Sequence, residues 1–369
     1  MTEIENRLVD AYEAATSTVR PEALRALTAP PARRRRRTWA APLAVAAALI
    51  LISVGVVALT GGTDSSRPDP ALIAQGPKYL VAVREGGRAE IVDAATGRKT
   101  ADIPTVDGKK YVAVAAGRDE ESFFLGADTT EEEGCAGQVY RVSVRANGTT
   151  TSPVLVPGGP YRGVRELAVS PHGTRLAVAQ ECNTYTGSVA TLTVIDLNAG
   201  TKKTWNRGSG GVENPTWAPD DRTLGYLGSP PRIRPKITLL DTGSGGGDVW
   251  KERQVRSPDI DHGKFKDGQI NAFVIDPDGR TMTAAVQGVK HGPDDHAEYV
   301  LAKLSVETGE FTGSRTQALP TDVFRFTTDV SGRHVLVLID GRPGRLDDGR
   351  FSWIPKTSFD WSDDRDLAW

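Results

Sequence analysis

The sequence lacks the short motifs that mark several large classes of enzyme. It contains no G-x-S-x-G turn, which presents the nucleophile of many serine hydrolases, and neither G-x-G-x-x-G nor G-x-x-x-x-G-K-[ST], which cradle phosphate groups. The glycine-rich stretch TGSGGGD at 242–248 is better interpreted as a hairpin loop. The formal net charge is only −2, so nothing global attracts nucleic acid. The sequence predicts no catalytic residue, no cofactor and no nucleic-acid partner.

Long helical patterns are scarce as well. Gly (39 residues) and Pro (23 residues) together exceed a sixth of the 369 residues, which indicates many turns and few long helices. Charged residues make up 25% and hydrophobic residues 38% of the chain, as in ordinary globular proteins. This composition excludes wholesale disorder, a collagen-like rod and a polytopic membrane protein. The length suits two domains, or one large β domain with an appendage.

One uncharged segment divides the chain. Trp39 to Leu59 form 21 residues without a charge, long enough for a helix of roughly 30 Å that spans the hydrocarbon core of a bilayer. Five arginines stand shortly before it: Arg33, Arg34, Arg35, Arg36 and Arg37. By the positive-inside rule they place the N-terminus in the cytoplasm. We therefore predict a single-pass cell-membrane protein with a cytoplasmic tail over 1–38, a transmembrane helix over 39–60, a linker over 61–77 and an extracytoplasmic domain over 78–369.

A cleaved secretory signal is the alternative explanation of this segment. Signals of that kind have an apolar core of about 7–15 residues and a short leading region, whereas 38 residues precede this span. In the tail, Ile4, Leu8, Tyr12 and Ala15 share one helical face. Such a helix rests on lipid or self-associates, or it docks a cytoplasmic regulator. The layout of tail, arginine run, span and outer domain resembles actinobacterial membrane proteins that accompany sigma factors, and that resemblance implies the regulator.

Two turn patterns recur beyond residue 78. Tight turns separate apolar runs in SPHG at 170–173, APDD at 218–221, DPDG at 276–279 and VSG at 330–332. A later hairpin closes on a glycine about every 50 residues, at Gly97, Gly148, Gly200, Gly243, Gly309 and Gly349. A period near 50 residues with four strands per unit is the signature of a β-propeller. The sequence therefore predicts an all-β fold of six blades, with insertion loops in the longest interval.

These turns, each followed by an apolar strand and then by a hairpin of the D-x-x-T-G kind, resemble the TolB-like and WD-repeat-like propellers over residues 78–369. The resemblance implies a binding platform outside the cytoplasmic membrane. Its partners would be other proteins or envelope components.

Two groups of polar residues are candidates for a site. His291, Asp294, Asp295 and His296 could hold a divalent metal, or they form a solvated insertion loop. Some six-bladed propellers are calcium-dependent lactonases, whose ligands converge on the central tunnel. Residues that could take this place before the innermost strands are Glu166, Glu213, Asn214 and Asn271. The alternative is that they satisfy backbone groups at strand ends.

Two predictions concern how the domain is held together. Cys135 and Cys182 stand at matching positions of consecutive units and outside the membrane, so we expect a disulfide between them. The first unit shows only three strands, and Asp366 to Trp369 echo an innermost strand. We therefore expect the C-terminal strand to pair with residues 79–84 and close the ring.

The sequence favours a non-catalytic binding or sensing module over an enzyme. We expect it to recognise a protein, peptide or cell-wall component on one face of the propeller, through loops mounted on a rigid scaffold. The alternative is a metal-dependent hydrolase of the lactonase type that uses the central tunnel.

Overall fold

The structure is a computed structural model. It describes residues 76–369 except 107, 120, 130–134, 185–186, 209–210, 230–235, 246, 249–252, 255–265, 291–295, 313–316, 320–322, 330–331, 340–341, 348–349, 356–363 and 369. All described residues belong to one compact unit, Ser66–Trp369. The predicted tail, arginine run, membrane span and most of the linker lie outside the described residues. Among the described residues, no helix has the length and apolar character needed to cross a membrane.

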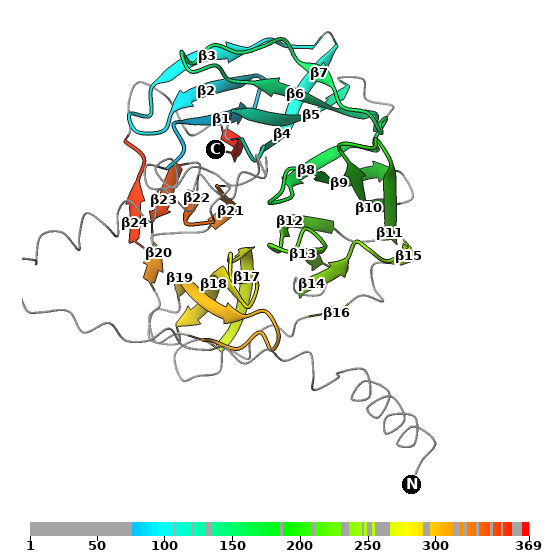
Figure 1. Cartoon of the computed structure of the whole chain (residues 1–369). Helices are drawn as coiled ribbons and strands as arrows, with labels where there is room; N and C mark the ends of the chain where they lie inside the picture. Colours follow the sequence, from blue (N-terminus) through cyan, green and yellow to red (C-terminus); the bar gives the residue numbers. More distant parts are fainter. Residues whose placement is uncertain are drawn as a thin grey trace, which may run out of the picture. The chain divides into compact units, whose positions relative to one another are not determined.

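The described strands form six sheets arranged in a ring around a central axis (Figure 1). The first blade contains β25 (Asp364–Ala368), β1 (Tyr79–Arg84), β2 (Ala89–Asp93) and β3 (Lys99–Ile103). The second contains β4 (Lys109–Ala116), β5 (Ser122–Thr129), β6 (Gly137–Ser143) and β7 (Val154–Leu155). The third contains β8 (Val164–Val169), β9 (Arg175–Thr184), β10 (Gly187–Asp196), β11 (Lys202–Gly208) and β15 (Gly247–Asp248).

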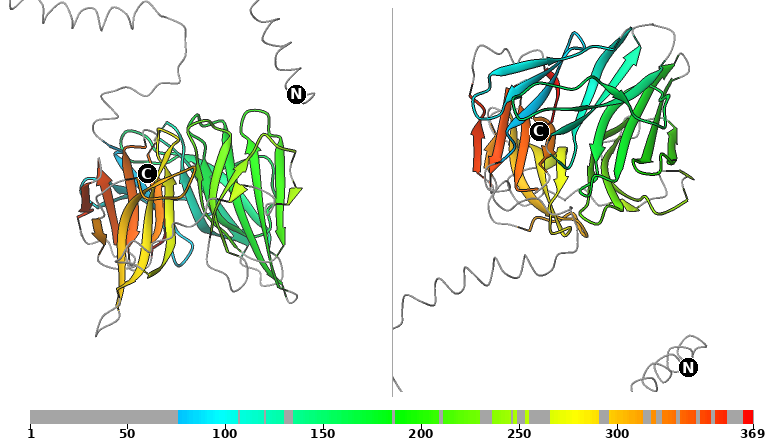
Figure 2. Two further views of the ribbon diagram at one scale, coloured as in Figure 1. Left: turned by 90° about the horizontal axis from the view of Figure 1, so that it is seen from below. Right: turned by 45° about the horizontal axis from the view of Figure 1, so that its top comes forward.

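The fourth blade contains β12 (Gly211–Trp217), β13 (Thr223–Ser229), β14 (Lys236–Asp241) and β16 (Arg253–Gln254). The fifth contains β17 (Lys266–Ile275), β18 (Thr281–Lys290), β19 (His296–Ser305) and β20 (Gln317–Leu319). The sixth contains β21 (Val323–Thr328), β22 (His334–Ile339), β23 (Arg342–Asp347) and β24 (Arg350–Trp353). The predicted six-bladed β-propeller is confirmed. Figure 2 shows the same ring in two further views.

One part of the predicted blade pattern is wrong. The blade built on β8 to β11 has five strands, because β15 pairs in parallel with the outer strand β11. β15 lies in the TGSGGGD stretch, which we expected to be only a hairpin loop of its own unit. Glycines allow this stretch to extend without side-chain bulk, so it covers the free edge of the neighbouring sheet. An alternating apolar pattern cannot reveal a strand of two residues.

The C-terminal strand closes the ring as predicted. β25 pairs antiparallel with β1, with Val81 opposite Ala368 and Ala82 opposite Leu367, and it lies toward the centre in Figure 1. Leu367 and Ala368 are fully buried. The first blade therefore takes strands from both ends of the domain, which leaves no unpaired inner edge there.

The core consists of apolar layers between neighbouring blades. Each of the six clusters of buried side chains joins two sheets, as where Leu80 and Leu367 of the first blade meet Leu336 of the last. Because no single sheet can bury both of its faces, the blades stabilise one another around the ring.

The tight turns pack on one another at one end of the ring. Gly332 and Gly279 have φ of +66° and lie against Pro277 and Pro219 of the preceding blade. A Cβ on Gly332 would stand 2.4 Å from Pro277. Asp221 takes the corresponding place in APDD with a φ of +55°. Its carboxylate accepts from the His172 N–H at 3.0 Å and from the Thr174 hydroxyl at 2.9 Å, which compensates for the strained backbone.

Candidate functional site

A cavity of about 140 Å³ lies on the propeller axis. Its walls come from β4, β8, β12, β17 and β21 and from the turns that follow these strands. We call the end of the propeller at which these innermost strands end the cavity face. The opposite end, where they begin, is the disulfide face. Because five blades contribute to one cavity, its shape depends on closure of the whole ring.

Side chains at the inner end of the cavity tie the innermost strands together. Asp366 accepts the backbone N–H of Val114 at 2.7 Å, and Glu166 accepts that of Asn214 at 2.6 Å. The side-chain oxygen of Asn214 in turn accepts the N–H of Phe273 at 3.0 Å. Each bond joins the innermost strands of two neighbouring blades. These polar groups therefore hold the ring together from the inside.

The bonds form where the innermost strands are irregular. Each of the six innermost strands shifts register against its neighbour, for example between Val164 and Glu166 and between Glu213 and Thr216. Asn214 lies at such a bulge with a φ of +53°. A bulge re-aims side chains, and here it lets polar groups of one strand reach the next.

One arginine joins two of these carboxylates. Arg325 on β21 contacts Asp366 with its Nε at 2.7 Å and Glu166 with one terminal nitrogen at 3.7 Å. The Asp366 side chain is 2% exposed, whereas Glu166 is 22% and Arg325 is 13% exposed. Glu166 and Arg325 thus reach the cavity, and Asp366 lies behind them. We call these three residues the axial triad.

Burial governs the ionisation of the axial triad. It raises the pKa of Asp366 to about 7, although the Arg325 charge and the Val114 N–H act in the opposite direction. Burial also raises the pKa of Glu166, again opposed by Arg325 and by the Asn214 N–H. Two carboxyl groups share one guanidinium, so the second negative charge is poorly compensated.

The structure brings together two of the four candidates for a tunnel site. Glu166 and Asn214 are bonded to each other and both border the cavity. Glu213 is exposed and is not part of the cavity wall, and Asn271 contacts Gln287 on β18 at 3.4 Å. All four lie within innermost strands rather than in the loops before them, because those strands begin earlier than their apolar runs.

Arg325 and Asp366 were not among the predicted site residues. A charged residue inside the apolar run FRFTT is the signal that could have identified Arg325. Asp366 was predicted only as part of the closing strand.

The second candidate group falls largely outside the described residues. This holds for His291, Asp294 and Asp295, while the backbone of His296 begins β19 and pairs with Lys290. Within the part of the chain that the structure describes, no three His, Cys, Asp or Glu residues are grouped as a metal site would require.

The predicted disulfide is present. Cys135 and Cys182 are bonded, with their Cα atoms 5.6 Å apart. Cys135 lies between β5 and β6 and Cys182 near the end of β9, so the bond joins two neighbouring blades at the disulfide face. It stands at the opposite end of the strands from the cavity opening.

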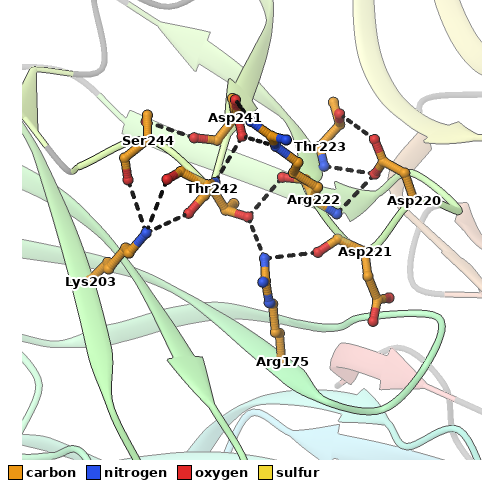
Figure 3. A network of polar contacts seen from close by, with 10 residues as sticks. Arg175, Lys203, Asp220, Asp221, Arg222, Thr223, Asp241, Thr242 and Ser244 are labelled. Carbon is orange, nitrogen blue, oxygen red and sulfur yellow. Dashed lines mark hydrogen bonds and ion pairs between the residues drawn. The ribbon is translucent and has the colours of Figure 1, made fainter. Parts of the chain in front are cut away.

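A second polar network lies between blades three and four (Figure 3). The Lys203 ammonium donates to the carbonyl oxygens of Thr242, Gly243 and Ser244 at 3.1–3.3 Å. Arg222 and Asp241 form a two-fold contact at 2.6 Å, and the Arg222 guanidinium holds the pKa of Asp241 at about 2. These charges are engaged in joining and bracing blades.

The comparisons with known proteins concern the fold. No protein-family model matches the chain, and no curated protein matches its sequence. Among solved structures, the chain is similar to TolB of Acinetobacter baumannii, with 14% identity over 79% of this chain and 66% of that one and a TM-score of 0.49. It is also similar to a periplasmic gluconolactonase of Pseudomonas aeruginosa, with 14% identity, coverage of 78% and 98%, and a TM-score of 0.48.

A third similar structure is the hydrazine synthase of Kuenenia stuttgartiensis, with 16% identity, coverage of 78% and 80%, and a TM-score of 0.45. The chain is a six-bladed β-propeller with TolB among its structural neighbours. Likeness at this distance carries no argument about activity.

Proposed function

We propose that this protein is a membrane-anchored, extracytoplasmic binding or sensing module without catalytic activity. Its cavity face recognises a protein, peptide or cell-wall component, and its tail reports to a cytoplasmic regulator or localises the protein. One observation carries the proposal. The polar groups on the axis, Glu166, Asn214 and Asp366, are engaged in bonds to neighbouring innermost strands. They build a rigid receptor wall, and rigid walls bind at low entropic cost.

The location is argued from the sequence and supported by the disulfide. The uncharged run from Trp39 to Leu59 and the arginines before it favour a span with the propeller outside. Disulfides persist in oxidising compartments and are rare in the cytosol. The bond between Cys135 and Cys182 therefore supports an extracytoplasmic propeller.

The second candidate is a metal-dependent hydrolase that uses the central tunnel. It is favoured by the position of Glu166 and Asn214 on the axis and by the pKa of about 7 at Asp366, a value that suits a general base. Against it stands the engagement of these oxygens. Both oxygens of Asp366 and the side-chain oxygen of Asn214 accept bonds from protein groups, whereas a calcium ion takes six to eight oxygen ligands.

Photo-crosslinking in intact cells tests the proposed binding face. A photoreactive amino acid is placed at His172, in the turn after β8, or at Arg162, just before β8, both exposed positions. The first lies at the cavity face and the second at the disulfide face, so they form a matched pair. We expect a discrete crosslinked partner from position 172 and none from 162. Products from 162 alone, or from neither position, would contradict recognition at the cavity face.

The same method tests the tail. A photoreactive residue at Tyr12 should capture a cytoplasmic transcription regulator if the tail signals. Capture of lipid or of a second copy of the chain alone would make the tail an anchor.

A further inference from the structure

The axial triad lacks one positive charge. Glu166 and Asp366 are two carboxylates, and Arg325 is the one cation that contacts them among the described residues. Arg325 is committed mainly to Asp366, at 2.7 Å, and is 3.7 Å from Glu166. Charges removed from bulk water are costly unless they are paired. Burial raises the pKa of both carboxyls and so disfavours their charged forms, and a proton or an external cation offsets that cost.

Glu166 has one oxygen available to the cavity. The Asn214 N–H and Arg325 both contact Oε2. Among the described residues, Oε1 makes no hydrogen bond, and the side chain borders the cavity with 22% of its surface exposed. A ligand that enters along the axis therefore meets a carboxylate oxygen at the inner end.

The other charged groups around the cavity do not supply the missing charge. Asp276 accepts from the hydroxyls of Thr281 and Thr283 and pairs with Lys303 at 2.6 Å. The Asp329 carboxylate accepts the backbone N–H of His334. Arg118 follows β4 at the cavity face rather than in the triad. Within the axial triad the poorly compensated charge is at Glu166, which is 3.7 Å from Arg325.

The ligand that fits is an ammonium rather than a metal ion. Both oxygens of Asp366 are already bonded, so the triad offers too few free oxygens for calcium. An ammonium needs only a charged acceptor and donates directly to it. The cavity wall also contains the half-buried apolar residues Ala116, Val169 and Pro215, which suit an alkyl chain.

We propose that the axial cavity binds a primary alkylammonium group, which donates to Oε1 of Glu166 while its alkyl chain packs against the apolar wall. This inference rests on the proposed function, since it names the chemistry recognised by the same cavity.

Calorimetric titration of the full-length protein tests it with three probes of equal size: n-butylammonium, n-butanol and butyrate. A charge-assisted hydrogen bond adds roughly tenfold or more in affinity, so butylammonium should bind at least about tenfold more tightly than butanol, and butyrate most weakly. Glu166→Gln keeps an oxygen for the Asn214 N–H but removes the charge, and it should abolish the preference for the cation. Glu213→Gln, on the exposed neighbour outside the cavity, should leave binding unchanged.

The outcomes separate the inference from the proposed function. Equal affinity for butylammonium and butanol, a preference for butyrate, or undiminished cation binding by Glu166→Gln would overturn the ammonium site. A partner crosslinked from position 172 would still support the binding module in each of these cases. Titration with a blocked lysine, whose main-chain ends are both capped, shows whether the bound ammonium belongs to a protein side chain or to a small free amine. Tighter binding of blocked lysine than of butylammonium assigns a protein side chain, and the reverse assigns a small free amine; both support the ammonium site.

Discussion

Replacing Asp366 with Asn should change how the stability of the propeller depends on pH. Asp366 lies on the closing strand, is 1% exposed, and contacts Arg325 and the Val114 N–H. Asn retains an oxygen for the Val114 N–H but does not titrate. The substitution therefore removes one titration while preserving the contact between the strands.

The magnitude follows from the shift in pKa. Folding raises the pKa of Asp366 from 3.8 to about 7. A carboxyl with a raised pKa contributes stability that is fully present below its unfolded pKa and is lost as pH rises through the folded pKa. At about 1.4 kcal/mol per pKa unit, the loss between pH 4 and pH 8 is about 4 kcal/mol. The unfolding free energy of the wild type, minus that of Asp366→Asn, should decrease by about this amount over that range.

Denaturant unfolding of the full-length protein at intervals between pH 4 and pH 8 provides the assay. Asp278→Asn serves as a control that should stay nearly constant over this range, because backbone N–H groups of Thr281 and Arg280 lower the pKa of the exposed Asp278 from 3.8. Its contribution is present above the unfolded pKa and is lost as pH falls. Parallel stability curves for the wild type and Asp366→Asn would refute the assignment of a buried, weakly compensated carboxyl to Asp366.

Three further predictions concern the scaffold. Deleting residues 362–369 removes β25 with its buried Leu367 and Ala368, and it should lower the unfolding free energy by several kcal/mol or prevent folding. Thermal melting measures the loss, and a melting temperature within a degree or two of the wild type would contradict closure of the ring by β25. Gly332→Ala places a Cβ 2.4 Å from Pro277 at a φ of +66°, so it should lower the unfolding free energy by about 1–3 kcal/mol. An unchanged midpoint of denaturant unfolding would refute the close packing of the turns. Cys135 and Cys182 are 47 residues apart, so reducing the bond between them should lower the unfolding free energy by about 4 kcal/mol. Two reactive thiols in the unfolded, unreduced protein would disprove the bond.

The architecture was largely predictable because it is repeated. Hairpin glycines such as Gly97 and Gly200 mark places where the backbone needs a positive φ, and their period predicted the blade count. The echo between the C-terminus and an innermost strand predicted the partner of β1, because closing a ring leaves few other choices. The matching positions of Cys135 and Cys182 predicted their contact for the same reason.

The axial site was only half predictable. Glu166 and Asn214 could be selected because each belongs to an innermost strand, and innermost strands face the axis. The contact of Arg325 with Asp366 joins β21 of the last blade to β25 of the first, and no local pattern encodes which charges meet there. β15 was missed because the edge it covers belongs to another blade. The sequence repeat predicts how many blades there are. It does not predict which side chains of different blades meet, because that depends on how the blades are placed against one another.

The central claim, a binding module rather than a metal-dependent hydrolase, is tested most directly by thermal melting of the full-length protein with calcium and with a chelator. A ligand that binds the folded state raises the melting temperature. The account predicts the same melting temperature in both conditions, because both oxygens of Asp366 and the side-chain oxygen of Asn214 already accept bonds from the protein, which leaves too few oxygens for calcium. A rise of several degrees in calcium that the chelator abolishes would contradict it and favour the hydrolase.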